Sequence, residues 1–384
     1  MSKVSARVLI AFISAFALVT ALFFLRPQAE PVTSVQTRDA AHPLSTSLAS
    51  ALPVVADIGN RSAHKPLLRA PLHGQAAIRA LGSNLGTAAA LNGRSPSNLK
   101  HLLRTDSTMW LTRTGHVFVR DEWPRPKVAA GATARGTSTT IAATPVANVF
   151  ALHSRPGSQR IIYLDFVGTT LGNDLWTDPA QQSTPVAQGN YAPWHLPAND
   201  PNASTSPNTW TATEQQDIQE IWTRVAEHYA PFDVDVTTDP ASAALLARTS
   251  ASDQVYGVRV LFEGGAFADN ASYASGTAAW KALCPSSSSS QGGCGGLASL
   301  GTISNPVTSQ EPAEYYGPAW IFADGLGPDY PKYMADAAAH EVGHSFDLTH
   351  QGTTTDPDCI GQPIGCSYSS GNNLWGPLMG APYN

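Results

Sequence analysis

Charged side chains are scarce in this sequence, and it has no long basic run. Asp, Glu, Lys and Arg make up 14% of its 384 residues, against about a quarter in an average soluble protein. The 23 basic side chains are outnumbered by 29 acidic ones, which gives a formal net charge of −6. A nucleic-acid-binding surface needs clustered Lys and Arg. The sequence therefore predicts no nucleic-acid partner.

Cysteine is also rare, and no two cysteines have the Cys-x-x-Cys spacing of a thiolate zinc site or a thioredoxin-like motif. The four cysteines all lie in the last third of the chain: Cys284, Cys294, Cys359 and Cys366. In an exported protein such cysteines form disulfides. Four cysteines allow three sets of pairings. We expect the local set, Cys284 with Cys294 and Cys359 with Cys366.

The N-terminus has the pattern of an export signal. Lys3 and Arg7 precede a largely apolar stretch over residues 8–25, which Arg26 closes. A basic start followed by an apolar run is typical of a signal peptide. The run is also close to the shortest length that crosses a bilayer. We expect a secreted or cell-envelope protein in which residues 1–27 are a cleaved signal or, as the less favoured alternative, a membrane anchor.

Composition divides the rest of the chain into an N-terminal region and one large domain. Ala, Pro, Ser and Thr dominate the residues after the apolar run, and such a composition buries too little apolar surface to offset the entropy of ordering. A helix at 98–104 and a hairpin around Gly115 predict a small packed module. The expected parts are 28–95, a low-complexity linker or propeptide; 96–124, the helix-hairpin module; 125–155, a linker; and 156–384, the main domain.

The main domain is predicted to combine strands and helices. Apolar residues recur at helical spacing from Ile218 to Tyr229, with Thr213 expected to cap the helix, Gln216 to complete a capping box and Pro231 to end it. Strands and helices in this order predict an α+β fold. The expected strands are 160–166, 232–237, 255–262, 297–303 and 319–323.

The most informative segment runs from Ala339 to His350 and reads AHEVGHSFDLTH. It contains the HExxH motif. On a helix, His340 and His344 lie one turn apart and can both bind one zinc ion, while Glu341 lies beside them as a general base. The alanine-rich run before the motif favours that helix.

The favoured third ligand is His350. On a continuous helix it would lie about 9 Å beyond His344 along the axis, so the helix must end before it. We expect Asp347 to close the helix in the left-handed conformation, where glycine is usual. Asp347 is excluded as a ligand because ligands on three successive turns lie too far apart for one zinc ion. No glutamate follows Glu341, and Asp356 remains an alternative.

These residues resemble the metzincin zinc-endopeptidase signature, HExxHxxGxxH, with Asp347 in place of its glycine. The segment around Met379 resembles the Met-turn of that clan, in which the methionine would form a hydrophobic floor under the metal. The resemblance covers about residues 160–384 and implies an α+β zinc-protease fold with a mixed, twisted sheet, an active-site helix and a Met-turn. Three further segments are similar to a family of exported bacterial metzincin-like proteins: 162–166, 229–235 and 322–327.

The sequence thus predicts an exported zinc-dependent endopeptidase that acts on protein or peptide substrates through a zinc-activated water, with Glu341 as general base. The metal ligands would be His340, His344 and His350. A peptide would extend along an edge strand supplied by 297–303 or 319–323, and Tyr383 is a further candidate for polarising the scissile carbonyl.

Two questions stay open at this level. An alternative function is a zinc-stabilised surface binding module without turnover, which the replacement of glycine by Asp347 motivates. The segment before about residue 150 is a candidate inhibitory or chaperoning propeptide. It contains no cysteine, so a thiol from this segment cannot be the group that blocks the zinc.

Overall fold

The structure is a computed structural model. It describes six stretches of the chain, 65–121, 147–285, 293–309, 311–327, 331–351 and 376–380. All six belong to one compact unit. Among these described residues, no helix is long and apolar enough to cross a membrane. Several predictions fall outside them: the signal or anchor at 1–27, Asp356, the pair Cys359 and Cys366, and Tyr383.

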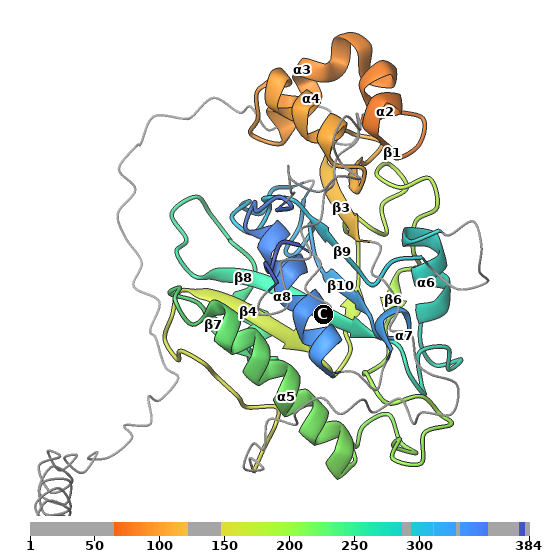
Figure 1. Cartoon of the computed structure of the whole chain (residues 1–384), viewed down its shortest axis with the longest axis vertical. Helices are drawn as coiled ribbons and strands as arrows, with labels where there is room; N and C mark the ends of the chain where they lie inside the picture. The colour runs from red at the N-terminus through yellow and green to blue at the C-terminus, as the bar shows by residue number, and fades with distance from the viewer. Residues whose placement is uncertain are drawn as a thin grey trace, which may run out of the picture. The chain divides into compact units, whose positions relative to one another are not determined.

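A mixed sheet of eight strands is the centre of this unit (Figure 1), and it confirms the α+β class. The spatial order of the strands is β1-β2-β3-β9-β10-β8-β4-β7. The last four in this order run parallel to one another, whereas β9 is antiparallel to both of its neighbours, β10 and β3. The bounds are Leu72–His73 (β1), Met109–Leu111 (β2), Val117–Asp121 (β3), Arg160–Asp165 (β4), Asp235–Thr237 (β7), Tyr256–Glu263 (β8), Gly296–Ser299 (β9) and Ala319–Phe322 (β10).

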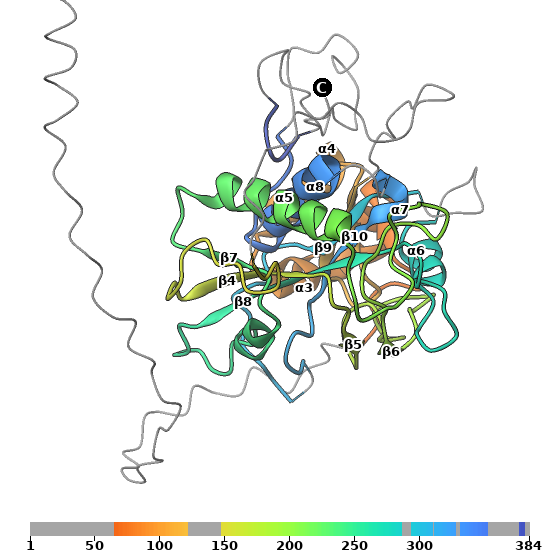
Figure 2. The ribbon, with the colours of Figure 1, turned by 90° about the horizontal axis from the view of Figure 1, so that it is seen from below.

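Two long helices, α5 and α8, pack on one face of the sheet, as Figure 2 shows. Their shared core includes Ile221 and Val225 of α5 and Ala335 and Val342 of α8. A small second sheet pairs β5 (Thr170–Leu171) with β6 (Gly189–Asn190). The helices are Gly74–Leu81 (α2), Leu85–Leu91 (α3), Pro96–Thr105 (α4), Ala212–Tyr229 (α5), Gly276–Leu283 (α6), Ala323–Leu326 (α7) and Pro331–Ser345 (α8), with 3₁₀ turns at Gly82–Asn84 and Pro240–Leu245.

The N-cap of helix α5 lies two residues earlier than predicted. Thr211, not Thr213, is the N-cap, and Glu214, not Gln216, completes the capping box. The Glu214 carboxylate also accepts a hydrogen bond from the backbone N–H of Leu196 at 3.1 Å. That contact holds the start of α5 against a loop that sequence spacing does not reveal. The helix ends at Tyr229, just before Pro231 as predicted.

The N-terminal region is more ordered than we expected. Helices α2 and α3 lie within 28–95, the range predicted to be a linker or propeptide of low complexity. They pack with α4 and the β2–β3 hairpin into a core of their own. The hairpin turns at Gly115, as predicted, with a φ of 100°. Its second strand, β3, then joins the main sheet beside β9, so the helix-hairpin module is not a separate body.

One predicted disulfide, Cys284–Cys294, is present in the structure. It links the end of α6 to the loop that enters β9, because Cys284 follows α6 directly and Cys294 lies two residues before Gly296. Both cysteines are buried among the aromatic side chains of the core on the other face of the sheet. The disulfide therefore anchors the strand that borders the candidate site.

Candidate metal centre

Helix α8 presents the motif and then ends where the spacing requires. It runs from Pro331 to Ser345, and Asp347 follows in the left-handed conformation with a φ of 76°. The backbone N–H of Leu348 donates to the carbonyl of Gly343 at 3.0 Å, which closes the last turn. The chain bends away at this point and turns back toward the helix. His350 is thereby brought beside the two helix histidines.

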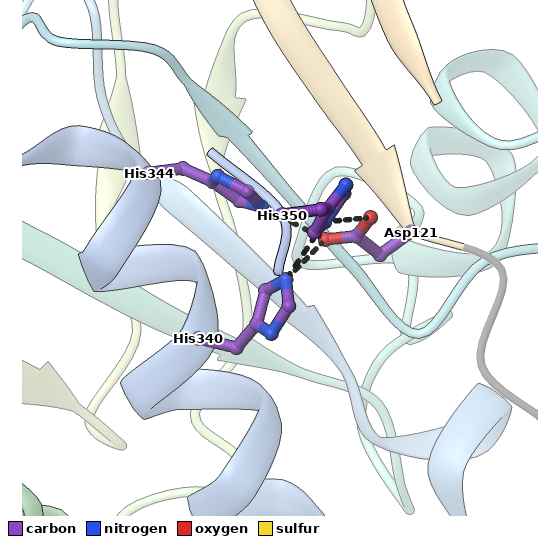
Figure 3. Close-up of side chains that lie close together, drawn as sticks. All are labelled: Asp121, His340, His344 and His350. Atoms are coloured by element: carbon purple, nitrogen blue, oxygen red, sulfur yellow. Dashed lines mark hydrogen bonds and ion pairs between the residues drawn. The ribbon is translucent and has the colours of Figure 1, made fainter. Parts of the chain in front are cut away.

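Three histidines and one aspartate converge at the end of β3 (Figure 3). The ligand atoms of Asp121, His340, His344 and His350 all lie within 4.8 Å of one another. Asp121 Oδ2 lies 3.1 Å from Nε2 of His340 and 3.3 Å from Nε2 of His344. Asp121 Oδ1 lies 3.2 Å from Nε2 of His350. Each of these side chains is at most 1% exposed.

Several of these spacings are close to those of a tetrahedral metal site. Four ligands at the usual zinc–nitrogen and zinc–oxygen distances would lie about 3.3 Å from one another. The distances between Asp121 and the three imidazoles are 3.1–3.3 Å, and His340 Nε2 lies 3.0 Å from His350 Nε2. Four buried donors, one of them a carboxylate, could thus hold a metal ion. The geometry alone does not select which metal.

Each histidine is oriented through its other ring nitrogen. Nδ1 of His340 donates to the carbonyl of Leu378 at 2.6 Å, and Nδ1 of His344 donates to the carbonyl of Leu348 at 2.8 Å. Nδ1 of His350 donates to Asp106 Oδ2 at 2.6 Å. Because each Nδ1–H is held by one of these acceptors, each Nε2 atom faces the common centre and offers its lone pair once it carries no proton, which is the tautomer that a metal requires.

The charges around the centre favour a bound cation. Burial lowers the pKa of His350, but the carboxylates of Asp121 and Asp106 outweigh it and raise that pKa to about 10. Burial raises the pKa of Asp121, yet the facing imidazoles lower it well below its ordinary value. His344 stays neutral because burial lowers its pKa to about 4. A proton on His350 therefore supplies the positive charge that a metal ion would replace.

Glu341 lies under β9, next to the strand that carries Asp121. The side chain is fully buried, and a Cβ atom on Gly296 would overlap its Oε1 atom. Gly296 is the residue that pairs with Asp121 in the β3–β9 register. The Glu341 carboxylate thus occupies the space that glycine leaves in this strand. Glu341, the predicted general base, is therefore held beside Gly296, the β9 residue that pairs with Asp121.

The segment 376–380 packs against the same helix. A Cβ atom on Gly343 would overlap Sδ of Met379, and Met379 is 9% exposed. The glycine in the middle of α8 therefore allows a close contact with the predicted Met-turn residue. Its neighbour Leu378 is the acceptor for His340, so this segment supports the helix and one candidate ligand together.

Sequence reasoning identified three of the four converging side chains and missed the fourth. Asp121 and the His350 partner Asp106 both come from the helix-hairpin module, which we had treated as separate from the main domain. The rival ligands weighed in the sequence lie after the motif. Asp347, excluded by spacing, instead forms an ion pair with Arg94 of the N-terminal region. The available signal was Asp121 itself, a carboxylate at the end of an apolar strand.

No protein-family model, no curated protein and no solved structure matches this chain. The metzincin assignment therefore remains a resemblance of motifs, and the functional argument depends on the geometry described above.

Proposed function

We propose that this chain is an exported zinc-dependent endopeptidase of the metzincin type. The observation that carries the proposal is the convergence of His340, His344 and His350 at one buried point. Glu341, the residue after His340 on α8, is buried against Gly296 of β9. Three neutral imidazoles are a ligand set found in catalytic zinc sites. The motif adds a carboxylate at the position of a general base. The basic and apolar N-terminus supports export.

The mechanism assigns each side chain one task. His340, His344 and His350 would hold a zinc ion, which would lower the pKa of the attacking water and polarise the scissile carbonyl. Glu341 accepts the proton of the attacking water and delivers it to the leaving amine. Asp106 and the carbonyls of Leu348 and Leu378 keep the imidazoles in the ligating tautomer. The strand expected to receive a peptide at its edge is not an edge strand, because β9 pairs with β3 and β10, and β10 pairs with β9 and β8.

A second function is favoured by one specific feature, the carboxylate of Asp121. Three histidines and an aspartate make a complete set of four, and a closed set is the mark of a structural zinc site. The chain would then be a zinc-stabilised binding module without turnover. This alternative requires Asp121 to stay bound permanently.

The test measures metal content and cleavage in the same preparations. We expect about one zinc ion per chain by mass spectrometry and cleavage of a peptide library that 1,10-phenanthroline abolishes. Cleavage is assayed in the wild type and in Asp121→Ala, because Asp121 takes the position of the attacking water. In the Asp121→Ala background, Glu341→Gln should keep the zinc and lower the turnover number by about 10² to 10⁴.

The matched control is Glu227→Gln, because Glu227 is an exposed glutamate on α5. It should change neither zinc content nor turnover. A chain that binds no zinc would refute the metal assignment. Full zinc content with no cleavage by wild type or Asp121→Ala would refute the endopeptidase and favour the binding module.

A further inference from the structure

Three carboxylates outside the metal centre gather at the ends of two neighbouring parallel strands. Glu263 is the last residue of β8, and in the β8–β10 register it lies opposite Phe322, the last residue of β10. Asp324 follows two residues later, in α7. Asp269 lies in the loop that leads from β8 to α6. Three separate segments thus bring acidic side chains to one end of the sheet.

Glu263 is a buried carboxylate in apolar surroundings. The residue is 2% exposed, and neither of its carboxylate oxygens has a hydrogen-bond partner among the described residues. Leu261, which shares its side of β8, and Phe322 opposite it both belong to the aromatic core on that face of the sheet. An unpaired buried carboxylate is costly, and in a native fold it points to a bound ion or water.

Glycine leaves space for this carboxylate at the start of α6. A Cβ atom on Gly276, the first residue of α6, would overlap Oε1 of Glu263. Asp269 is fixed at the same place, because its Oδ1 atom accepts hydrogen bonds from the Ser275 hydroxyl at 2.5 Å and from the backbone N–H of Thr277 at 3.2 Å. The two carboxylates therefore lie beside the same turn of α6.

Asp324 approaches the same place from α7. A Cβ atom on Gly264, the residue after Glu263, would lie 3.2 Å from Oδ1 of Asp324. Helix α7 also packs against α6, because a Cβ atom on Gly325 would lie 2.9 Å from a ring carbon of Trp280. Figure 1 shows the two helices near one another at this end of β10. The carboxylate of Asp324 thus lies against the backbone next to Glu263.

The charges of these groups are not balanced at Glu263. Burial raises the pKa of Glu263 well above its ordinary value, and the neighbouring charges of Asp324 and Asp269 raise it further. The backbone N–H of Gly264 is the only group that lowers it. The nearby cation, Lys281, acts on Asp269 instead. A bound cation would offset the repulsion and give the oxygens of Glu263 a partner.

We propose that Glu263 and Asp324 bind a calcium ion, with Asp269 adding negative charge on the solvent side. Calcium takes six to eight oxygen ligands in a flexible geometry, and backbone carbonyls and water complete such a set, whereas magnesium demands a near-ideal octahedron. Asp269 is exposed, Asp324 is half-buried and Glu263 is buried, so an ion can enter from solvent. This inference does not depend on the proposed endopeptidase.

The test is thermal unfolding of the full-length chain with and without calcium, at a constant zinc concentration so that the metal centre does not change. About 10 mM calcium should raise the melting temperature of the wild type by about 3–10 °C, as expected for the dissociation constants of about 0.1–1 mM of extracellular calcium modules. Glu263→Gln keeps the size of the side chain but removes its charge, and it should lose this shift. The control Glu227→Gln changes an exposed glutamate on α5 and should keep it.

Terbium(III), a luminescent substitute for calcium, reports on the position of the ion. Trp280 lies on α6 against α7, so excitation of tryptophan should produce terbium emission in the wild type, and calcium should displace it. Glu263→Gln should weaken terbium binding by at least about tenfold, because it removes a charged ligand.

Two results would overturn the calcium site. A wild type that calcium does not stabilise is what a protonated Glu263 without a cation would give. An equal shift in wild type and Glu263→Gln would place the calcium elsewhere. If Glu263→Gln does not fold, as judged by circular dichroism, Asp324→Asn takes its place in both measurements. Neither measurement depends on peptide cleavage, so a failure of the proposed endopeptidase remains distinguishable from a failure of this site.

Discussion

At the scale of single residues, His350 depends on two carboxylates from the N-terminal segment 65–121. Asp106 accepts from its Nδ1 atom, and Asp121 faces its Nε2 atom at 3.2 Å. Both carboxylates favour the charged imidazolium, and together they outweigh the effect of burial on the pKa. The third ligand of the motif is thus oriented by residues some 240 positions away. Its environment cannot be understood from the motif alone.

Metal uptake should release a proton from this residue. The pKa of metal-free His350 is about 10, so at pH 8 its Nε2 atom carries a proton that must leave before a metal can bind. His344 contributes none, because its pKa is about 4. We expect about one proton per metal ion at pH 8, measured by isothermal titration calorimetry in buffers with different ionisation enthalpies.

The variant Asp106→Asn removes one of the two carboxylates that raise the pKa of His350. Proton release should then begin to fall at a lower pH than in the wild type, because metal-free His350 is already partly neutral there. The matched control Asp233→Asn changes an exposed aspartate outside the site and should leave the release profile unchanged. Metal binding at pH 8 without any proton release would contradict this account.

At the scale of elements, α8 and the segment 376–380 form one support for the ligands. Gly343 leaves the space into which Met379 packs, and the adjoining carbonyl of Leu378 orients His340. Glycine in a helix costs about 1 kcal/mol relative to alanine. The close contact with Met379 explains why the helix contains a glycine at this position.

Gly343→Ala should therefore destabilise the protein although alanine is the better helix former. Overpacking against Met379 costs about 1–3 kcal/mol, which exceeds the helix-propensity gain of about 1 kcal/mol. Displacement of the acceptor for His340 should also weaken metal binding by about tenfold. Denaturant unfolding and a chelator competition measure the two effects.

A control with the opposite expected sign exists in α3. Gly86 is exposed, and a Cβ atom there would meet no heavy atom within 4 Å. Gly86→Ala should raise the free energy of unfolding by about 0.5–1 kcal/mol. If both variants raised the free energy of unfolding, the contact between Gly343 and Met379 would not be what makes alanine unfavourable at position 343.

Elements set by local sequence were the predictable ones. Apolar periodicity predicts the buried face of α5, and Pro231 predicts its end. The spacing of His344 and His350 requires α8 to end between them, and α8 ends at Ser345. The left-handed Asp347 also follows from local geometry. The cap was placed at Thr213 because two adjacent Thr-x-x-Glu/Gln patterns overlap, and tertiary contacts of Glu214 select the earlier one.

The fourth candidate ligand, Asp121, was not predictable from the same reasoning. Asp121 reaches the histidines only because β3 pairs with β9, which lies more than 170 residues later in the chain. Neither hydrophobic periodicity nor a helix cap indicates that β3 pairs with β9. The register matters as well, because a change of one residue would move Asp121 to the other face of the sheet. The order of 72–91 was missed for a related reason. Its alanine-rich helices are stabilised by burial against α4 and β2, which composition alone does not show.

At the scale of the whole molecule, a metal ion would join two parts of the chain. Three candidate ligands lie on α8 and the turn after it, and the fourth lies at the end of the N-terminal segment. A bound ion stabilises the state that contains all four ligands, by about 2.7 kcal/mol at a concentration one hundred times its dissociation constant. The two parts should therefore separate more readily when the metal is removed.

Hydrogen exchange measures this separation in each part of the same molecule. Chelation should speed amide exchange in β3 and in α2 to α4, while β4 stays protected because the hydrophobic clusters to which its side chains belong contain no residue of the segment. In Asp121→Ala, the three histidines still bind the metal. Removal of the metal from this variant should no longer change amide exchange in 65–121. An equal acceleration throughout the sheet would instead mean that 65–121 unfolds together with the main domain, as a permanent part of one core would.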